Sequence, residues 1–354
     1  MAVVRRLLGS AAGAAVLLGS GLVAPAQAAG TPTGSMDGAT AEAVRIAERI
    51  DEAFPDTGQD PARARARPGQ GLVADGHRLR IDLPDTSRDT LTLARTDTDT
   101  DTDTGAGTGT RTGTVDRTPL TLGLPKGAAQ RPAQPTKDGT VAYPDALPHT
   151  DLAVQPLQRS ARVQAVLKDA AAPTELTYPV DVPEGGRLSQ GEDGSVAVLD
   201  ARGNPVGGID APTARDADGK AVPASYRIEG HSVVQTVRHD TAAHPVVTDA
   251  QASAGAILSA RWEVRGDGPS FYVWTADWFR HNQLIRPNTG TVGAWAEVLV
   301  EYGHLIPHNR GGLYDQFACH HQFAQGNPVW HLEDWRQDGS YLWTVWHECN
   351  PPRA

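Results

Sequence analysis

The chain has 354 residues, of which 39% are hydrophobic, 21% charged and 6% aromatic. This composition supports one or two globular domains and excludes a fibrous chain. The 42 acidic residues exceed the 32 basic ones, and the resulting net charge of −10 argues against a nucleic-acid partner recognised through its phosphates. Two cysteines exclude a disulfide-dense scaffold and a four-thiolate zinc site, and they leave room for one disulfide or one reactive thiol.

Residues 1–28 have the pattern of a secretory signal peptide. Arg5 and Arg6 precede an apolar run over residues 7–23, and Ala26-Gln27-Ala28 offers the small-x-small pattern that signal peptidase accepts. We expect cleavage after Ala28 and a secreted, extracellular product. A retained membrane anchor is the alternative, but the run is interrupted by glycine and is shorter than the about 20 apolar residues of a membrane span. No membrane span is expected after cleavage.

Residues 29–95 are predicted to contain one amphipathic helix and short strands. Between Asp37 and Phe54 apolar residues recur every three or four positions among charged ones, and Pro55 ends the pattern. The apolar face is therefore expected to cover another part of the chain. A membrane-surface helix is the alternative, but the polar face mixes both charge signs. The apolar residues are Ala43, Val44, Ala47, Ile50 and Phe54.

Residues 96–150 are predicted to be a linker. Thr-Asp and then Gly-Thr repeats fill positions 96–114 without a large apolar residue, so nothing there offsets the entropy cost of ordering the chain. A calcium-binding Asp ladder is the alternative, but the glycine-pinned turn and the closing Glu of such loops are absent. Prolines continue the linker in a stiffer form. They are Pro119, Pro125, Pro132, Pro135, Pro144 and Pro148.

Residues 151–250 are predicted to form an all-β module of antiparallel hairpins. Short β-type runs alternate with turn pairs such as Gly185-Gly186 and Asp193-Gly194. The absence of cysteines and of an acid–base cluster favours a structural role. From Glu175-Leu-Thr-Tyr-Pro179 to Pro245-Val-Val247 the region resembles a β-rich module common in secreted actinobacterial proteins. That resemblance implies extracellular architecture and no activity.

Residues 259–354 concentrate the chemically distinctive side chains. All eight Trp, both Cys and seven of the twelve His lie after Ala260. The patterns predict a small α+β domain that begins with a hairpin of residues 260–264 and 270–275. Helices over 291–302 and 313–324 follow. The domain is expected to close with a second hairpin, of residues 329–336 and 341–349, in which alternate residues share one face.

Cys319 and Cys349 are predicted to form a disulfide, because an exported chain meets oxidising conditions. A catalytic thiolate beside His320 is the alternative. The bridge would bring His320 and His321 near His347. Such a cluster would bind zinc or perform acid–base chemistry, whereas the simpler interpretation is that these histidines only form hydrogen bonds at a domain surface.

Four ordered motifs of this region carry a family resemblance. They are Ala294-Trp-Ala-Glu297, Asp315-Gln-Phe-Ala-Cys-His320, Trp330-His-Leu-Glu-Asp-Trp-Arg336 and Cys349-Asn-Pro351. Together they resemble the C-terminal domain of exported actinobacterial proteins classed as domain of unknown function family 2599. The resemblance covers about 90 residues and implies an extracellular location and a disulfide, but no established activity. His331, Asp334 and Gln337 depart from the family pattern.

A shorter motif, Gly303-His-Leu-Ile-Pro307 followed by His308-Asn-Arg-Gly-Gly312, is similar to an element of metal-dependent nucleases found in secreted toxins. The resemblance implies a role for His304 as general base near a bound metal. It covers ten residues, and the chain lacks the basic surface that such a nuclease needs for its substrate.

These patterns favour an exported binding or interaction protein that acts through its Trp-rich C-terminal domain. The expected partner is a cell-wall polymer, a glycan or an extracellular protein, because Trp and Tyr faces bind sugars and proteins alike. Nucleic acid is not favoured, and the oligomeric state stays open. The candidate binding residues are Trp335, Trp346, Arg336, Asp315 and Gln316.

The alternative function is a metal-dependent hydrolase or nuclease-type toxin. No cofactor is predicted, and zinc is kept as the alternative. The catalytic candidates are His304, His320, His347 and Glu333, and the candidate metal ligands are His320, His321 and His347.

Overall fold

The computed structural model describes residues 38–55, 59–67, 71–96, 118–282, 285 and 289–354. The predicted signal peptide and nearly all of the Thr-rich repeat lie outside these residues. In the described part the strands pair antiparallel, which confirms the predicted β-rich architecture. No helix of that part is long and apolar enough to cross a membrane.

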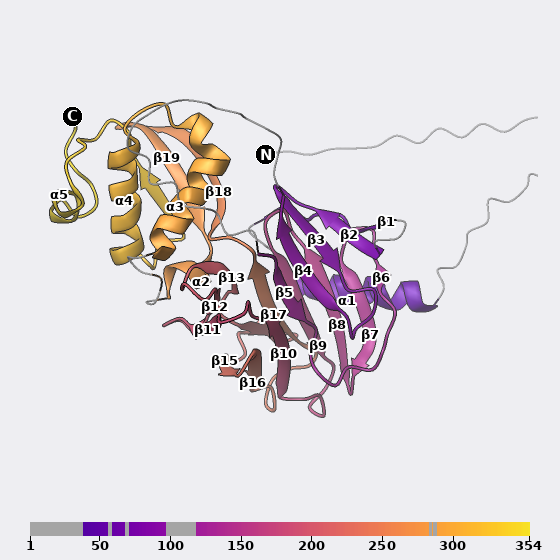
Figure 1. The fold of residues 1–354 in the computed structure, drawn as a ribbon. Helices are drawn as coiled ribbons and strands as arrows, with labels where there is room; N and C mark the ends of the chain where they lie inside the picture. The colour runs from indigo at the N-terminus through magenta and orange to yellow at the C-terminus, as the bar shows by residue number, and fades with distance from the viewer. Residues whose placement is uncertain (1–37, 56–58, 68–70, 97–117, 283–284, 286–288) are drawn as a thin grey trace, which may run out of the picture. The chain divides into compact units, whose positions relative to one another are not determined.

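The first sheet has eight strands and uses residues from both sides of the Thr-rich repeat (Figure 1). The strands are β1 (Arg65–Arg67), β2 (Gly71–Asp75), β3 (Leu79–Leu83), β4 (Thr90–Arg95), β5 (Leu120–Gly123), β10 (Glu175–Asp181), β15 (Ala224–Glu229) and β16 (Ser232–Val237). Their order in the sheet is β1-β2-β3-β4-β5-β10-β16-β15. The module therefore begins far upstream of residue 151.

The second sheet has nine strands (Figure 1). They are β6 (Gln134–Pro135), β7 (Val141–Leu147), β8 (Thr150–Pro156), β9 (Ala161–Leu167), β11 (Arg187–Gln190), β12 (Val196–Leu199), β13 (Pro205–Ile209), β14 (Thr213–Arg215) and β17 (Val246–Ser253). Eight of them follow the order β11-β12-β13-β17-β9-β8-β7-β6, and β14 pairs with β17 beside this path.

The main core lies between these two sheets, and helix α1 (Gly38–Ala53) covers the second face of the nine-stranded sheet. Alternate residues of each strand enter the core, as the period of two requires. Strands β8 and β9 are buried at every position, because Ile46 and Ile50 of α1 pack over Ala153 and Val166. The amphipathic helix expected between Asp37 and Phe54 is thus present, and its apolar face covers a sheet.

The prediction of a linker is wrong for residues 120–150, which form β5 to β8. Alternating apolar residues such as Leu120 and Leu122 enter the main core. The prolines there do not prevent pairing, because Pro135 lies in the two-residue edge strand β6 and Pro144 lies where the β7–β8 register shifts. Edge strands and bulges are the positions at which a sheet accepts proline.

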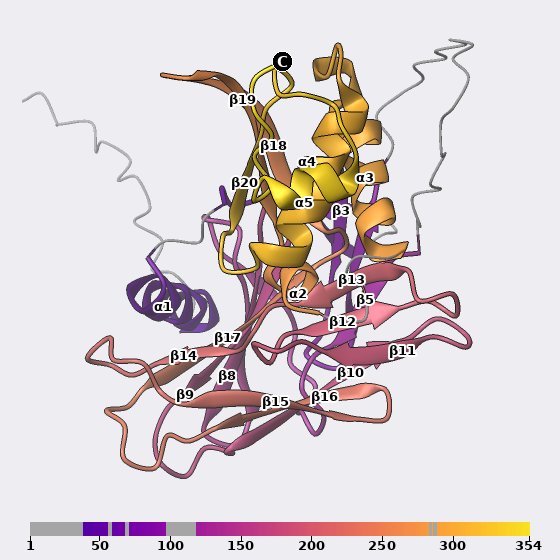
Figure 2. The same cartoon turned by 90° about the vertical axis from the view of Figure 1, so that its left-hand side faces the viewer.

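The C-terminal domain places helices against one face of a three-stranded sheet (Figure 2). Its elements are β18 (Ile257–Arg265), β19 (Gly268–Thr275), α2 (Asp277–Arg280), α3 (Thr289–Tyr302), the 3-10 turn η1 (Gly303–Leu305), α4 (Arg310–Phe323), β20 (Val329–Leu332) and α5 (Tyr341–Trp346). The sheet order is β18-β19-β20. Phe317 of α4 meets Trp330 of β20 edge to face, with ring centroids 5.1 Å apart, at the centre of an aromatic core.

The predicted closing hairpin is wrong in its second half, because residues 341–346 form α5 instead of a strand. The Ser340 hydroxyl accepts a hydrogen bond from the Trp343 amide and caps the helix. Beyond the helix, Glu348 and Cys349 adopt positive φ, so the chain reverses and Cys349 reaches Cys319 on α4. The alternation of aromatic residues in this segment is therefore not the signature of a strand.

Trp278 of α2 joins the C-terminal domain to the second sheet. The side chain is buried together with Ala197 and Leu199 of β12, and its indole Nε1 donates to the Ser253 hydroxyl at 2.8 Å. Gly208 of β13 leaves the space for this ring, since a Cβ there would lie 2.4 Å from it. The packing of Trp278 therefore requires glycine at position 208.

Buried ion pairs form a second connection between the two parts. Arg95, at the end of β4, contacts Glu297 at 2.8 Å and Glu301 at 2.6 Å, and Arg159 contacts Glu301 at 2.9 Å. Burial raises the pKa of Glu297, and the Arg95 guanidinium opposes that rise. Both glutamates lie on α3, so the pairs hold this helix against the first part of the chain.

We predict that Arg95→Met lowers the free energy of unfolding by about 3 to 5 kcal/mol, because Glu297 loses its cation and stays buried. Denaturant unfolding followed by Trp fluorescence measures the change. The matched control is Arg45→Met, which removes an exposed pair with Glu42 and is expected to change stability by less than about 1 kcal/mol. Equal small effects of the two substitutions would contradict the role given to Arg95.

Candidate functional site

An aromatic surface lies on the face of the three-stranded sheet opposite α3 and α4. Strand alternation sends Phe271 and Val273 into the core, and it sends Tyr272 and Trp274 outward. The two outward rings stack at 5.7 Å with their planes 27° apart. His331 of β20 is the register partner of Tyr272, and its ring lies 4.2 Å from the Tyr272 ring. We call Tyr272, Trp274 and His331 the aromatic face.

Polar side chains border the aromatic face. The Arg261 guanidinium lies 4.4 Å from the Trp274 ring centre, within the range of a cation–π interaction. Arg261 also pairs with Glu263 on the same strand at 2.6 Å. The aromatic face therefore combines flat apolar rings with hydrogen-bonding groups at its rim.

A polar cleft of about 530 Å³ opens along the free edge of β20. We call it the His320 cleft, after the α4 histidine that lines it. Side chains from four separate parts of the domain line it. They include Arg265 and Asp267 where β18 turns into β19, His320 of α4, His331, Glu333 and Arg336 of β20 and the segment that follows it, and Asn350 near the C-terminus.

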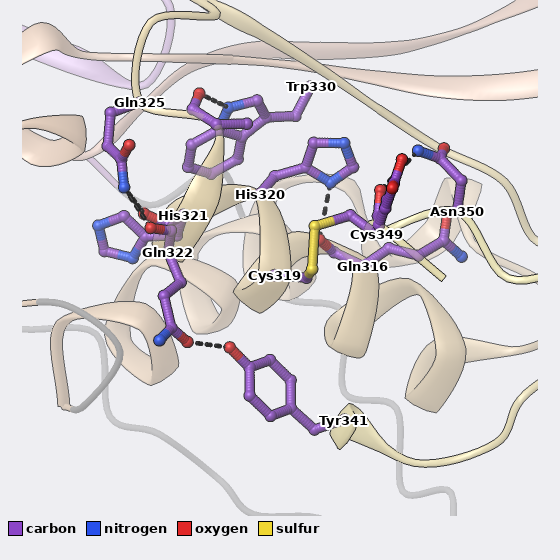
Figure 3. Close-up of a disulfide and its surroundings, with 12 residues drawn as sticks. Gln316, Cys319, His320, His321, Gln322, Gln325, Trp330, Tyr341, Cys349 and Asn350 are labelled. Carbon is purple, nitrogen blue, oxygen red and sulfur yellow. Dashed lines mark hydrogen bonds between the residues drawn. A yellow bond between two sulfur atoms is a disulfide. The ribbon is translucent and has the colours of Figure 1, made fainter. Parts of the chain in front are cut away.

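His320 is held in one tautomer (Figure 3). Its Nδ1 donates to the Gln316 carbonyl oxygen at 2.8 Å, one helical turn back on α4. Burial lowers the pKa of His320 below its ordinary value, against the opposing effects of that hydrogen bond and of Glu333. The imidazole is therefore neutral at pH 7, and its Nε2 carries a lone pair.

His331 is held in the opposite tautomer. Its Nδ1 is hydrogen-bonded to Arg265, and a guanidinium only donates, so this nitrogen accepts and the proton lies on Nε2. Burial lowers the pKa of His331, and the positive charge of Arg265 lowers it further, against the opposing effects of Glu333, Glu263 and Asp267. His320 therefore has an accepting Nε2 and His331 a donating Nε2, and both residues line the cleft.

Gln316 and Glu333 fix the geometry of this edge. The Gln316 side chain accepts from the Glu333 amide at 2.9 Å and donates to the Glu333 carbonyl at 2.9 Å. The Glu333 carboxylate accepts from the Ser270 hydroxyl at 3.0 Å and from Arg336 Nε at 2.7 Å. All of these groups are largely buried, so α4, β19 and the chain after β20 are held in one arrangement.

A second, more apolar cleft of about 430 Å³ adjoins the first and shares His320 and Asn350 with it. We call it the disulfide cleft, because the Cys319–Cys349 bridge lines it together with Phe323 and Val345. The bridge confirms the predicted disulfide and rules out the alternative of a catalytic thiolate, since no cysteine of the chain is free. Figure 3 shows His320 beside the bridge.

A third cleft, of about 950 Å³, adjoins the other end of the aromatic face. Trp274 and Arg261 line it, and Pro328 belongs both to it and to the His320 cleft. Asp210 also lines it, and burial together with the charge of Asp277 raises the pKa of Asp210 to about 7. Its carboxylate accepts from the Trp278 amide at 3.1 Å, which ties β13 to the start of α2.

The predicted cluster of His320, His321 and His347 does not form. His321 is fully buried, where Nδ1 pairs with the Thr291 hydroxyl at 2.8 Å and Nε2 donates to the Phe279 carbonyl at 3.1 Å. The His347 ring lies against the Trp343 ring, with centroids 4.2 Å apart. Across the described ranges, no group of three or more His, Cys, Asp or Glu side chains is placed to hold a metal ion.

Of the four catalytic candidates, the structure brings His320 and Glu333 together in the His320 cleft. His304 is exposed on η1 and is absent from the residues that line this cleft. His347 is likewise absent from its lining. The second histidine of the cleft is His331, which the sequence analysis did not place at a site.

The five predicted binding residues do not lie together at one site. Arg336 lines the His320 cleft, and Gln316 is a buried clamp. Trp335 donates to the Pro269 carbonyl at 2.8 Å, with the guanidinium groups of Arg336 and Arg353 each 4.7 Å from its ring. Trp346 is 75% exposed. Asp315 is partly buried, and burial together with the charge of Asp338 raises its pKa.

Sequence reasoning did not identify Tyr272 and Trp274 as site residues. The signal was present, because these residues alternate with Phe271, Val273 and Thr275 along one predicted strand. When both alternating sets of a strand are hydrophobic or aromatic, the second set either packs under another element or forms an exposed patch, and an exposed patch marks an interaction surface.

We predict that the double substitution Cys319→Ala and Cys349→Ala lowers the free energy of unfolding by about 3 to 4 kcal/mol. The bridge closes a loop with a sequence separation of 30, and cross-linking limits the freedom of the unfolded chain to about that extent. Denaturant unfolding of both oxidised proteins measures the loss. A loss well below 1 kcal/mol would show that contacts other than the bridge hold the segment after α5.

The C-terminal domain is also the part of the chain that matches a known protein family. No curated protein sequence matches the chain. Residues 257–352 match the model of the family described as Protein of unknown function (DUF2599), as the four motifs in the sequence indicated. The family match covers the whole three-stranded sheet and therefore includes the aromatic face and the side chains of the His320 cleft.

Proposed function

We propose that this protein is an exported binding protein whose C-terminal domain holds a glycan, such as a cell-wall polymer, along the aromatic face. Export is supported by the signal-peptide pattern of residues 1–28. Binding is supported by one observation above all: the outward rings of Tyr272 and Trp274 lie side by side on one strand, with clefts at both ends of the row.

The chemistry of the aromatic face suits a sugar ring. A pyranose presents C–H groups on its faces and hydroxyls around its rim, so it stacks on an aromatic ring and forms hydrogen bonds beside it. Tyr272 and Trp274 supply the flat rings, and both residue types combine apolar area with a polar atom. Arg261 and His331 lie next to these rings and supply donors at the rim.

The position of the clefts favours an extended ligand over a single sugar. Pro328 belongs to both the third cleft and the His320 cleft, so these two clefts adjoin across the aromatic face. The disulfide cleft then continues from His320. A polymer lying along this path would contact residues of all three strands, whereas a monosaccharide would fill only a part of it.

The alternative of a metal-dependent hydrolase has no supporting observation in the described ranges, because the candidate ligands His320, His321 and His347 have different neighbours. A protein partner would more naturally use the exposed side chains Leu342 and Trp346 of α5. These residues therefore provide a control for the proposed glycan surface.

The test is sedimentation of the full oxidised chain with purified bacterial cell wall. We predict saturable binding that Trp274→Ala weakens about tenfold, the equivalent of about 1.4 kcal/mol, because the stacking surface is lost. Trp346→Ala, which removes an exposed indole outside the aromatic face, is expected to leave the affinity unchanged. Tyr272→Ala provides a second variant on the same face.

Each outcome of this experiment has a defined meaning. Loss with both Trp274→Ala and Tyr272→Ala, but not with Trp346→Ala, supports the aromatic face. Loss only with Trp346→Ala would move the binding surface to α5 and contradict the proposal. Absence of saturable sedimentation would remove the cell-wall polymer as the ligand.

A further inference from the structure

We propose that the His320 cleft is a metal-independent esterase site, which hydrolyses carboxylic esters formed between an apolar acyl group and a sugar or similar polyol. This activity goes beyond the proposed binding function and does not require it. The inference is drawn from the paired tautomers of His320 and His331, from the Arg265 guanidinium, and from the contrast between the two adjoining clefts.

His320 has the properties of a general base. Its Nδ1–H is donated to the Gln316 carbonyl, so the ring cannot rotate without breaking a hydrogen bond, and Nε2 is the basic atom. His320 lines both the polar and the apolar cleft. A water molecule at their junction would therefore lie within reach of a neutral imidazole, the form that removes a proton.

His331 and Arg265 have the properties of an oxyanion site. Arg265 holds His331 with its proton on Nε2, and both residues line the His320 cleft. An N–H of a neutral imidazole and the N–H groups of a guanidinium are donors that stabilise the negative charge of a tetrahedral intermediate. Glu333 pairs with Arg336 at 2.7 Å, which weakens the repulsion between its carboxylate and that charge.

The two clefts determine the class of ester. The disulfide cleft, with Phe323 and Val345, offers apolar side chains to an acyl group. The His320 cleft is polar, with Asn350 and Arg336 at its wall, and it adjoins the aromatic face through Pro328. An ester whose carbonyl lies at His320 would place its acyl chain in the disulfide cleft and its polyol in the His320 cleft.

The reaction balances with water alone. His320 Nε2 takes a proton from water, whose oxygen forms a bond to the carbonyl carbon while the carbonyl electron pair moves onto oxygen beside Arg265 and His331. The tetrahedral intermediate then re-forms the carbonyl, and the C–O bond to the polyol breaks. The leaving alkoxide takes the proton from the His320 imidazolium. One ester and one water give one carboxylic acid and one alcohol, without oxidant or metal.

The experiment uses the full oxidised chain with p-nitrophenyl butyrate in the presence of a chelator. We expect saturable release of nitrophenol. We expect His320→Gln to lower kcat/KM by about 100-fold or more, the usual contribution of a general base. The matched control is His304→Gln, which removes an exposed imidazole outside the cleft and is expected to leave the rate unchanged.

Two further readouts keep the test decisive if His320→Gln disturbs folding. Arg265→Met changes an exposed residue at the end of β18 and is expected to lower kcat by at least about tenfold with little change in KM. The wild-type rate is expected to stay constant as the pH falls from 8 through the ordinary pKa of histidine. It should decline only at lower pH, because burial lowers the pKa of His320.

Absence of saturable hydrolysis, or equal rates in the wild type and in His320→Gln and Arg265→Met, would overturn the esterase proposal. The outcome is separable from that of the binding proposal. Because p-nitrophenyl butyrate carries no sugar, its hydrolysis tests the His320 cleft, whereas sedimentation of Trp274→Ala with cell wall tests the aromatic face. Failure of one proposal therefore leaves the other standing on its own result.

Discussion

The buried amide of Gln316 is the contact on which the geometry of the C-terminal domain depends. The Gln316 side chain accepts from the backbone N–H of Glu333 and donates to its backbone carbonyl, as a neighbouring strand would. These backbone groups, which lie beyond the end of β20, thereby have hydrogen-bond partners. His320 lies one helical turn after Gln316, and His331 lies two residues before Glu333. The contact between Gln316 and Glu333 therefore also brings the side chains of His320 and His331 into the same cleft. An apolar residue at position 316 would leave two buried backbone groups without partners.

Other contacts hold α4 and the chain after β20 in place from both sides. The disulfide joins α4 to the segment after α5 beside His320. On the far side, Arg95 and Arg159 hold the two glutamates of α3, and Trp278 fills the space above Gly208. The aromatic core between α4 and β20 lies on the inner face of the three-stranded sheet. The outward residues Tyr272 and Trp274 therefore lie on a sheet whose other face packs against a buried core, and side chains fixed in this way lose less entropy when a ligand binds.

Periodicity in the sequence predicted the elements whose neighbours follow the same simple pattern. The α1 helix, the β18–β19 hairpin, α3 and α4 were predicted in this way, and all are present. The disulfide followed from the expected compartment. Residues 120–150 were misinterpreted because proline density suggested a linker, whereas Pro135 lies in an edge strand, Pro144 at a register shift and Pro148 in a turn. Residues 341–346 were misinterpreted because alternation suggested a strand, whereas Ser340 caps a helix. The site was only half predictable: His320 and Glu333 were candidates, but the partner His331 becomes visible only when β20 and α4 are placed side by side.

The proposed chemistry of the C-terminal domain requires two neutral imidazoles of opposite tautomer in one cleft. Nitrogen-15 NMR of the full oxidised chain, with labelled histidine and with His320→Gln and His331→Gln for assignment, observes this directly. The account predicts that at pH 7 His320 carries its proton on Nδ1 and His331 carries its proton on Nε2. It also predicts that both stay neutral until the pH falls below the ordinary pKa of histidine, because burial lowers both pKa values. The same tautomer at both residues, or an imidazolium at either one at pH 7, would contradict it.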